Sequence, residues 1–127
     1  MIIGIGVDIV DVSRIEQRLN ASEGFRDLVF SASEIDYCLS KTHSQESFAA
    51  RFAAKEAFLK ALGVGIDFGI ELKEIVVVNN EAGKPSIVVS EKLKTYLMQH
   101  LGFIPDIQVS LSHTKEQAIA FVLFNKI

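Results

Sequence analysis

Cysteine is scarce in this sequence, which has only Cys38 among its 127 residues. One cysteine cannot form a disulfide within the chain, and this is typical of proteins from a reducing compartment such as the cytoplasm. Long hydrophobic runs are also missing, since none approaches the roughly 18 residues that a membrane-spanning helix requires. The first residues, MIIGIGVD, have no basic stretch ahead of the apolar one and do not resemble a secretion signal. We therefore expect a cytoplasmic protein that does not enter a membrane.

Basic residues do not outnumber acidic ones. The chain has 13 Lys and Arg against 16 Asp and Glu, which gives a net charge of −3. It lacks the basic excess typical of nucleic-acid binding, so we expect no nucleic-acid partner. The sequence also contains no P-loop, no dinucleotide-binding glycine motif and no nucleophile elbow. Its histidines do not have the spacing of zinc ligands, so these classes of site are excluded.

Apolar residues are abundant, at 49% of the chain. A sheet rich in Val and Ile would explain this content, and so would an oligomer that buries part of the excess between subunits. The chain has no internal repeat, linker or low-complexity segment. Its length suits one hydrophobic core, so a single domain over residues 1–127 is expected.

Four helices are predicted from start and stop signals in the sequence. Two Ser-x-x-Glu patterns have the form of a capping box, and two glycines follow apolar segments at positions suited to end a helix. The helices are expected from near Ser13, from Ser31 to about Leu39, from 44 to 62 before Gly63, and from Ser90 to Gly102.

Short apolar segments with alternating or continuous patterns predict the strands. They are expected at 1–7, 75–78, 86–90, 107–113 and 118–124, with a turn at 79–85 and a loop at 64–69. Strands and helices follow one another in an order that favours an α+β fold. We expect a mostly antiparallel sheet with the long helix packed against it.

The long helix contains the segment RFAAKEAFLKALG at 51–63, which is apolar around nearly all of its circumference. Such a helix is normally buried, yet it carries four charges. Arg51 and Lys55 are four residues apart and repel each other unless an anion lies between them. Glu56 and Lys60 have the same spacing with opposite charges, and apolar neighbours of Glu56 predict a partly desolvated carboxylate. The pattern fits a structural ion network and an anion or metal site equally well.

Two further residues are candidates for chemistry. Asp8 should share one face of the first strand with Gly4 and Gly6, which leave room for a backbone or a ligand. It could bind a metal or cap the turn into the next helix. His113 should end a strand, where it could donate to a phosphate or have a structural role. Two carboxylates with nearby cations suit an Mg²⁺-dependent enzyme that acts on a phosphate compound.

Five motifs, taken together and in this order, resemble those of the bacterial holo-[acyl-carrier-protein] synthases, which are small 4′-phosphopantetheinyl transferases. They are GIGVDIVDVSRI at 4–15, FSASE at 30–34, RFAAKEAFLKALG at 51–63, GKP at 83–85 and SLSHT at 110–114. The resemblance extends from the first residues to the last hairpin. It implies a 4′-phosphopantetheinyl transferase-like fold and transfer of 4′-phosphopantetheine from coenzyme A to a serine of apo-acyl carrier protein. It also implies release of adenosine 3′,5′-bisphosphate, a homotrimer with sites between subunits, and a role in fatty-acid (lipid) biosynthesis.

The resemblance assigns the metal and the reacting phosphates to residues of the first strand and the long helix. Asp8 and Glu56 would hold Mg²⁺, and Lys60 would stabilise or protonate the leaving phosphate. The base that activates the carrier serine is left open between Glu56, a metal-bound water and a carboxylate such as Asp36.

Other residues are implied in binding the substrates. Arg51, Lys55 and His113 are candidates for contacts with the phosphates of coenzyme A, and Lys84 and Pro85 for the nucleotide pocket. The carrier protein is acidic, so a basic patch is needed to bind it. Its candidates are Arg14, Arg18 and Arg26, each of which could instead belong to a solvated helix face.

Two other functions remain open at this point. The chain could be a non-catalytic oligomeric module that binds coenzyme A or a nucleotide. It could also be a structural oligomer in which the helix charges form an internal network. The combination of Asp8, Glu56 and Lys60 favours the enzyme, because binding alone would not require this set.

Overall fold

The computed structural model describes residues 1–64 and 69–127, and the predicted loop at 64–69 therefore lies mostly outside the described residues. The helices and strands follow the predicted mixture. They are β1 (Ile2–Asp11), α1 (Val12–Ala21), α2 (Glu23–Val29), α3 (Ala32–Leu39), α4 (Ser44–Leu62), the short 3₁₀ helix η1 (Leu72–Glu74), β2 (Ile75–Asn79), β3 (Pro85–Val89), α5 (Glu91–Leu101), β4 (Asp106–His113) and β5 (Gln117–Asn125). No helix among these described residues has the length and apolar character to cross a membrane.

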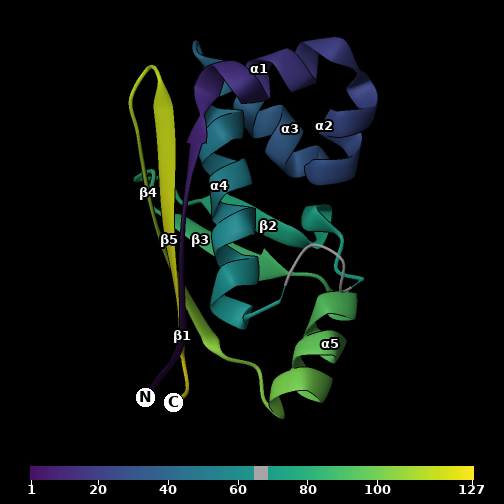
Figure 1. Cartoon of the computed structure of the whole chain (residues 1–127), viewed down its shortest axis with the longest axis vertical. Coiled ribbons are helices and arrows are strands. Elements are labelled where there is room, and N and C mark those ends of the chain that lie inside the picture. The colour runs from purple at the N-terminus through teal and green to yellow at the C-terminus, as the bar shows by residue number, and fades with distance from the viewer. Residues whose placement is uncertain (65–68) are drawn as a thin grey trace.

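The strands form two antiparallel sheets. β5 lies in the centre of a three-stranded sheet in the order β1-β5-β4, and β2 pairs with β3 in a separate two-stranded sheet. The long helix α4 packs on β1 and β5, while α1 to α3 cluster at one end of the molecule and α5 lies at the other (Figure 1). This arrangement confirms the α+β fold with mostly antiparallel strands and a long helix against the sheet.

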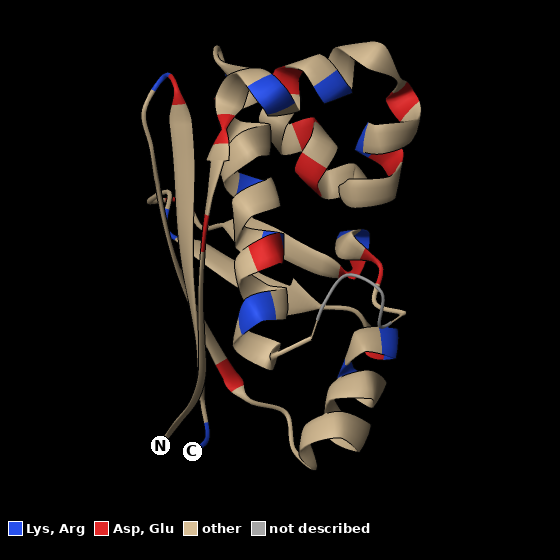
Figure 2. Cartoon of the chain, in the orientation of Figure 1, with Lys and Arg blue, Asp and Glu red and all other residues tan. Residues whose placement is uncertain are grey.

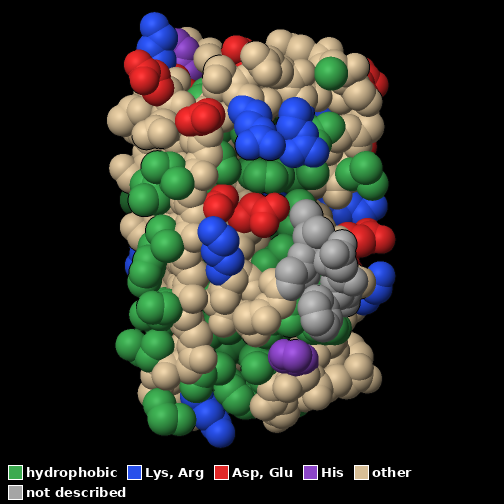
Figure 3. All heavy atoms as spheres, in the orientation of Figure 1, with side chains coloured by type: hydrophobic (Ala, Val, Ile, Leu, Met, Phe, Trp, Pro, Cys, Tyr) green, Lys and Arg blue, Asp and Glu red, His purple; other side chains and the backbone are tan. Residues whose placement is uncertain are grey.

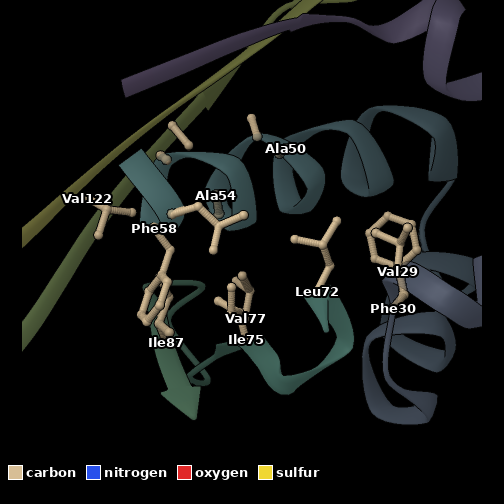
Figure 4. Packing of buried hydrophobic residues seen from close by; sticks show 14 of the residues in the cluster. Val29, Phe30, Ala50, Ala54, Phe58, Leu72, Ile75, Val77, Ile87 and Val122 are labelled. Carbon is tan, nitrogen blue, oxygen red and sulfur yellow. The ribbon is translucent and has the colours of Figure 1, made fainter. Parts of the chain in front are cut away.

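Helix α4 is buried around most of its surface, as its sequence predicts. Twelve of its 19 residues are buried. Phe58 packs edge-on against Phe124 of β5, with 5.0 Å between the ring centroids. Other side chains of the same helix face β2 and β3, where Ile75, Val77 and Ile87 lie close to Phe58 (Figure 4). The helix can therefore place charged residues only where a partner or an opening exists.

The ends of the helices confirm some of the predicted capping residues and contradict others. Ser31 and Glu34 form the predicted capping box, and Gly63 ends α4 with a left-handed φ of 81°. The capping box predicted at Ser13 is wrong, because α1 already begins one residue earlier and has Asp11 in the N-cap position. Asp11 ends a strand that continues past the predicted limit at residue 7, and the helix starts directly from it. The short helix α2 was not predicted.

Gly4 and Gly6 bring β1 into close contact with the backbone of α4. A Cβ atom at Gly4 would lie 2.2 Å from the carbonyl oxygen of Ala61, and one at Gly6 would lie 2.0 Å from that of Ala57. These distances are too short for any side chain, so the two glycines allow helix and strand backbones to touch. The same close approach places Asp8, two residues further along the strand, next to the middle of α4.

We expect Gly6→Ala to lower the free energy of unfolding by about 1–3 kcal/mol, because strand and helix must separate to admit the methyl group. Urea unfolding followed by circular dichroism measures this change. Gly24→Ala on α2 is the matched control, since its Cβ would meet only the Ser22 hydroxyl at 3.0 Å. Equal stability of Gly6→Ala and the wild type would contradict the proposed close packing.

Candidate active site

A cavity of about 400 Å³ opens where β1, α1 and α4 meet. Its lining contains three acidic groups and two basic ones, together with apolar and amide side chains. The charged residues that line it are Asp8, Asp11, Arg14, Arg18 and Glu56. Figure 2 shows acidic segments of β1 and α4 near each other, with basic segments on α1 above them. In the space-filling view, the acidic and basic side chains gather on one open face (Figure 3).

Asp8 reaches this cavity because it lies on the side of β1 that faces α4, together with Gly4 and Gly6. Its neighbour in the sheet is Ala120 of β5, which is completely buried and leaves space beside the carboxylate. The Asp8 side chain is 16% exposed and accepts a hydrogen bond of 3.1 Å from Nζ of Lys60. Lys60 also donates to the carbonyl oxygen of Val7, over 3.0 Å. The strand therefore holds both a carboxylate and the ammonium group next to it.

Glu56 lines the same cavity as Asp8 and lies on α4 about one turn before Lys60. Burial raises the pKa of its carboxyl group, and the neighbouring Asp8 carboxylate raises it further. The cations Lys60 and Arg18 oppose this shift. Within residues 1–64 and 69–127, no ion pair to Glu56 is formed, so the pairing with Lys60 suggested by the helical spacing is replaced by the Asp8–Lys60 contact.

The two carboxylates fit a divalent cation. A half-buried Glu56 next to a second carboxylate is an electrostatically costly arrangement, and a bound cation would relieve it. Mg²⁺ commonly takes one or two protein carboxylates and completes its shell with waters and substrate phosphates. Among the described residues, no three His, Cys, Asp or Glu side chains are placed so that they could hold one metal ion together, so a site made entirely of protein ligands is not formed there. Asp8 and Glu56 thus fit a magnesium ion that also binds a phosphate substrate.

The three predicted docking arginines have separate environments, since Arg14 and Arg18 lie on α1 and Arg26 lies on α2. Arg14 and Arg18 both line the cavity, and the guanidinium group of Arg18 lies 4.2 Å from the ring centre of Phe25. Arg26 instead donates to Asp27 and lines a second hollow between α1, α2 and α4. The structure therefore brings two of the three predicted docking residues to the rim of the acidic site.

Lys55 does not face this cavity, and its prediction as a phosphate contact is wrong. Its side chain is fully buried and its ammonium group donates to Glu34 over 2.7 Å, to the carbonyl oxygen of Leu72 over 3.0 Å and to that of Ile75. Burial lowers the pKa of Lys55, and the contact with Glu34 opposes that shift. The four-residue spacing of Arg51 and Lys55 suggested that an anion lies nearby. For Lys55, this anion is the carboxylate of Glu34.

Arg51 is also buried, but unlike Lys55 it has one polar atom, Nε, without a hydrogen-bond partner in the described residues. Its terminal nitrogen donates to Asn79 over 2.6 Å, and its guanidinium group lies 4.2 Å from the ring centre of Tyr37. Arg51 lies outside the lining of the acidic cavity, next to β2, and retains one unused donor.

The other candidate substrate contacts do not line the acidic cavity. His113 ends β4 and lines a hollow that shares Ile9 and Gln117 with that cavity. Lys84 is exposed in the turn between β2 and β3, where its backbone N–H donates to Asn80, and Pro85 is the first residue of β3. Asp36 is exposed on α3 and also lies outside the cavity lining. One chain therefore assembles the metal and diphosphate candidates but not the remaining ones.

Several residues around these sites were not predicted from the sequence. Gln117 lines the cavity and its amide donates to Asp11 across the sheet over 3.3 Å, a contact that depends on strand pairing between distant segments. Glu34 was detected only as part of a capping box, although its second role is to neutralise Lys55. Glu46, which contacts His113, gave no signal except its position in the first turn of α4.

Comparison with known proteins agrees with this arrangement. The family model of the 4′-phosphopantetheinyl transferase superfamily matches residues 4–122. A holo-[acyl-carrier-protein] synthase from Cytophaga hutchinsonii is 64% identical over 126 residues, which cover 99% of each chain. Crystal structures of such synthases are also similar. The one from Neisseria meningitidis has a TM-score of 0.87 and 34% identity over 99% of this chain and 100% of the other. The one from Helicobacter pylori, in complex with coenzyme A, has a TM-score of 0.81 and 32% identity over 95% and 99%.

The α+β fold with its acidic cavity and these matches define the class of protein. The chain belongs to the 4′-phosphopantetheinyl transferase superfamily. Within it, the chain groups with the holo-[acyl-carrier-protein] synthases, and it is accordingly an enzyme, a transferase. The non-catalytic alternatives are therefore not favoured.

Proposed function

We propose that the chain transfers the 4′-phosphopantetheine group of coenzyme A to a serine of apo-acyl carrier protein in an Mg²⁺-dependent reaction. The observation that carries this proposal is that Asp8 and Glu56 line one cavity and that Lys60 forms an ion pair with Asp8. The coenzyme A in the Helicobacter pylori relative supports the identity of the donor. The protein names of the relatives support a carrier protein as the acceptor.

The reaction forms one bond and breaks one. The serine oxygen bonds to the phosphorus that carries the pantetheine, and the bond from that phosphorus to the bridging diphosphate oxygen breaks. Adenosine 3′,5′-bisphosphate leaves, and the serine proton is released. Phosphoryl transfers of this kind depend mainly on positioning and on stabilisation of negative charge.

Asp8, Glu56 and Lys60 each have a role in this step. Asp8 and Glu56 would hold Mg²⁺, which when bound supplies positive charge to the diphosphate. The ammonium group of Lys60, positioned by Asp8 and Val7, would donate a hydrogen bond to the leaving phosphate or protonate it. Because its side chain is 56% exposed, Lys60 can exchange its partner Asp8 for the substrate without unfolding any part of the helix.

The remaining substrate contacts are proposed for residues outside this cavity. Arg51 is supported by its buried Nε, which would be satisfied by a phosphate oxygen. Lys84 is exposed in a turn next to Pro85, so its ammonium group would be accessible to a phosphate of the nucleotide. His113 has a half-exposed ring, which would contribute a further donor. The separation of Arg51 and Lys84 from Asp8 and Glu56 within one chain favours a site completed by a second copy.

A homotrimer is proposed on the same basis. The face of the three-stranded sheet that points away from α4 carries large apolar side chains that are 36–60% exposed, which is unusual for a surface in water. They form a continuous outer face and comprise Ile3, Ile5, Val7, Ile9, Ile119 and Phe121. Hydrophobic side chains are visible along the edge of the molecule that carries this sheet (Figure 3). Contact between copies would bury this face.

Replacing Phe121 with Glu should therefore disrupt the oligomer, because the charge would be buried at the centre of the contact. Light scattering after size-exclusion chromatography should give the mass of a trimer for the wild type and of a smaller species for the variant. Met98→Glu is the control, since Met98 is also an exposed apolar residue, at 52%, but lies on α5. A wild-type chain that elutes as a monomer would refute this part of the proposal.

The carrier protein is proposed to dock where Arg14 and Arg18 line the cavity, with Arg26 extending the contact along α2. Basic side chains at the rim would attract an acidic partner and guide its serine toward the diphosphate. The physiological setting that this activity implies is lipid biosynthesis in the cytoplasm.

Mass spectrometry of apo-acyl carrier protein tests the proposed function. Incubation with the chain, coenzyme A and Mg²⁺ should add the mass of one phosphopantetheine group to the carrier protein. Addition of EDTA should stop the reaction, and Mg²⁺ in excess should restore it. A carrier protein of unchanged mass under all of these conditions would refute the proposal.

A further inference from the structure

The side chains of His113 and Glu46 form a pair that lies outside the lining of the acidic cavity. His113 ends β4, and Glu46 lies in the first turn of α4. Nδ1 of the histidine lies 3.1 Å from Oε1 of the glutamate. The glutamate side chain is only 13% exposed, whereas that of the histidine is 46% exposed. A nearly buried carboxylate thus holds one nitrogen of a ring whose other side is open to solvent.

The sheet determines the direction of this ring. His113 is paired with Ala118 of β5, and Ala118 is paired with Val10 of β1. Residues directly opposite each other in a sheet point to the same face, so His113 lies on the α4 side, as Ala118 does. Glu46 is ten residues before Glu56, which corresponds to about 15 Å along the helix axis. The pair therefore lies on the same helix as the acidic cavity, and the hollow that His113 lines shares Ile9 and Gln117 with that cavity.

The contact with Glu46 determines which ring nitrogen of His113 carries a proton. An ionised carboxylate can only accept hydrogen bonds, so Nδ1 of His113 must donate to Glu46. Nε2 is then the nitrogen left for a ligand. A phosphate also accepts only, and a ring bound between the two must carry protons on both nitrogens. Such an imidazolium would balance the negative charges of Glu46 on one side and of the phosphate on the other.

We propose that Glu46 is a positioning residue, which orients His113 so that Nε2 faces an anionic phosphate of coenzyme A. This inference rests on the proposed function, since it names coenzyme A as the ligand of His113. Carboxylate–histidine pairs act in the same way at metal centres, where the carboxylate fixes both the tautomer and the ring orientation. Glu46 itself does not touch the substrate.

A second histidine, His43, lies near Glu46 without a hydrogen bond to it, and it serves as a control for proximity alone. Nδ1 of His43 lies 4.0 Å from Oε2 of Glu46, which is beyond hydrogen-bond distance, and its side chain is 70% exposed. His43 is therefore near the same carboxylate without being held by it. Glu91 provides another comparison, because it is a first-turn glutamate of α5 that contacts Lys94 rather than a histidine.

The test combines nuclear magnetic resonance with calorimetry. Ring ¹⁵N shifts should show a proton on Nδ1 of His113 in the wild type and a mixture of tautomers in Glu46→Ala. Coenzyme A should bind about tenfold more weakly to Glu46→Ala, the usual effect of losing a hydrogen bond to a charged group. His113→Ala should be weakened as much, and the double variant no further. His43→Ala and Glu91→Ala should bind like the wild type.

Three results would overturn the inference: unchanged ring shifts in Glu46→Ala, unchanged coenzyme A affinity in that variant, or losses that add up in the double variant. The last result would mean that Glu46 acts independently of His113. A failure of the proposed function would differ from these, because the wild type would then leave the carrier protein unmodified in the mass assay. Binding of coenzyme A and its dependence on Glu46 would still decide the inference in that case.

Discussion

Glu56→Ala should reduce transfer of phosphopantetheine by about a thousandfold, the effect expected when a group that stabilises developing charge is removed. The cavity would lose one of the two carboxylates that can hold Mg²⁺, and the diphosphate would lose the positive charge placed against it. Initial rates of carrier modification, followed by mass spectrometry, measure this loss. Asp8→Ala should show a loss of similar size, since it removes the other carboxylate and releases Lys60.

The fold should survive the loss of the Glu56 carboxylate. Glu56 is half-buried with a raised pKa, so its ionised form costs stability in the absence of metal. The sign follows from proton binding: between the ordinary and the raised pKa, the folded state binds more protons than the unfolded state, and stability falls as the pH rises. Glu56→Gln in EDTA should therefore melt at a higher temperature than the wild type at neutral pH, and this difference should shrink in acid. A variant that is inactive because it is unfolded would contradict this account.

Lys55→Met should have the largest effect on stability, about 3–5 kcal/mol, because it leaves the Glu34 carboxylate buried without a counter-charge. Lys55 donates to that carboxylate and to two backbone carbonyl groups, and both side chains are excluded from solvent. Glu34 also accepts from the backbone of Ser31 and Val77, so the pair connects α3, α4 and β2. Loss of the ammonium group affects all of these elements, and urea unfolding measures the cost.

Two companion variants make this prediction specific. Lys60→Met on the same helix should cost less than about 1 kcal/mol, because its partner Asp8 forms a solvent-exposed ion pair with it. Combining Lys55→Met with Glu34→Gln should recover part of the loss, since the neutral amide no longer needs a counter-charge. Equal costs for Lys55→Met and Lys60→Met would show that the buried pair is not what stabilises this region.

The comparison of these two lysines explains what the sequence could and could not predict. Both stand in the segment RFAAKEAFLKALG, and both have an acidic partner. The helical pattern correctly predicted a buried helix with isolated charges. It could not show that the partner of Lys55 comes from α3 and that of Lys60 from β1, because those contacts join residues 21 and 52 positions apart. Long-range contacts, rather than local spacing, determine that Lys55 has a structural role and that Lys60 lies at the candidate active site.

The first strand shows the opposite case, in which local pattern was sufficient. Alternation placed Gly4, Gly6 and Asp8 on one face, and the glycines predicted close approach of a backbone or a ligand. The structure contains the backbone of α4 against the glycines and the cavity next to Asp8. The positions of His113, Lys84 and Pro85 relative to that cavity were beyond prediction, because each depends on the packing of a separate strand or turn.

Anomalous X-ray diffraction of crystals grown with coenzyme A and Mn²⁺, a substitute for Mg²⁺, tests the central claim most directly. An anomalous peak is expected between the carboxylates of Asp8 and Glu56, in contact with the diphosphate and with Lys60 nearby. A peak at another place, or a diphosphate bound away from these two carboxylates, would contradict that claim.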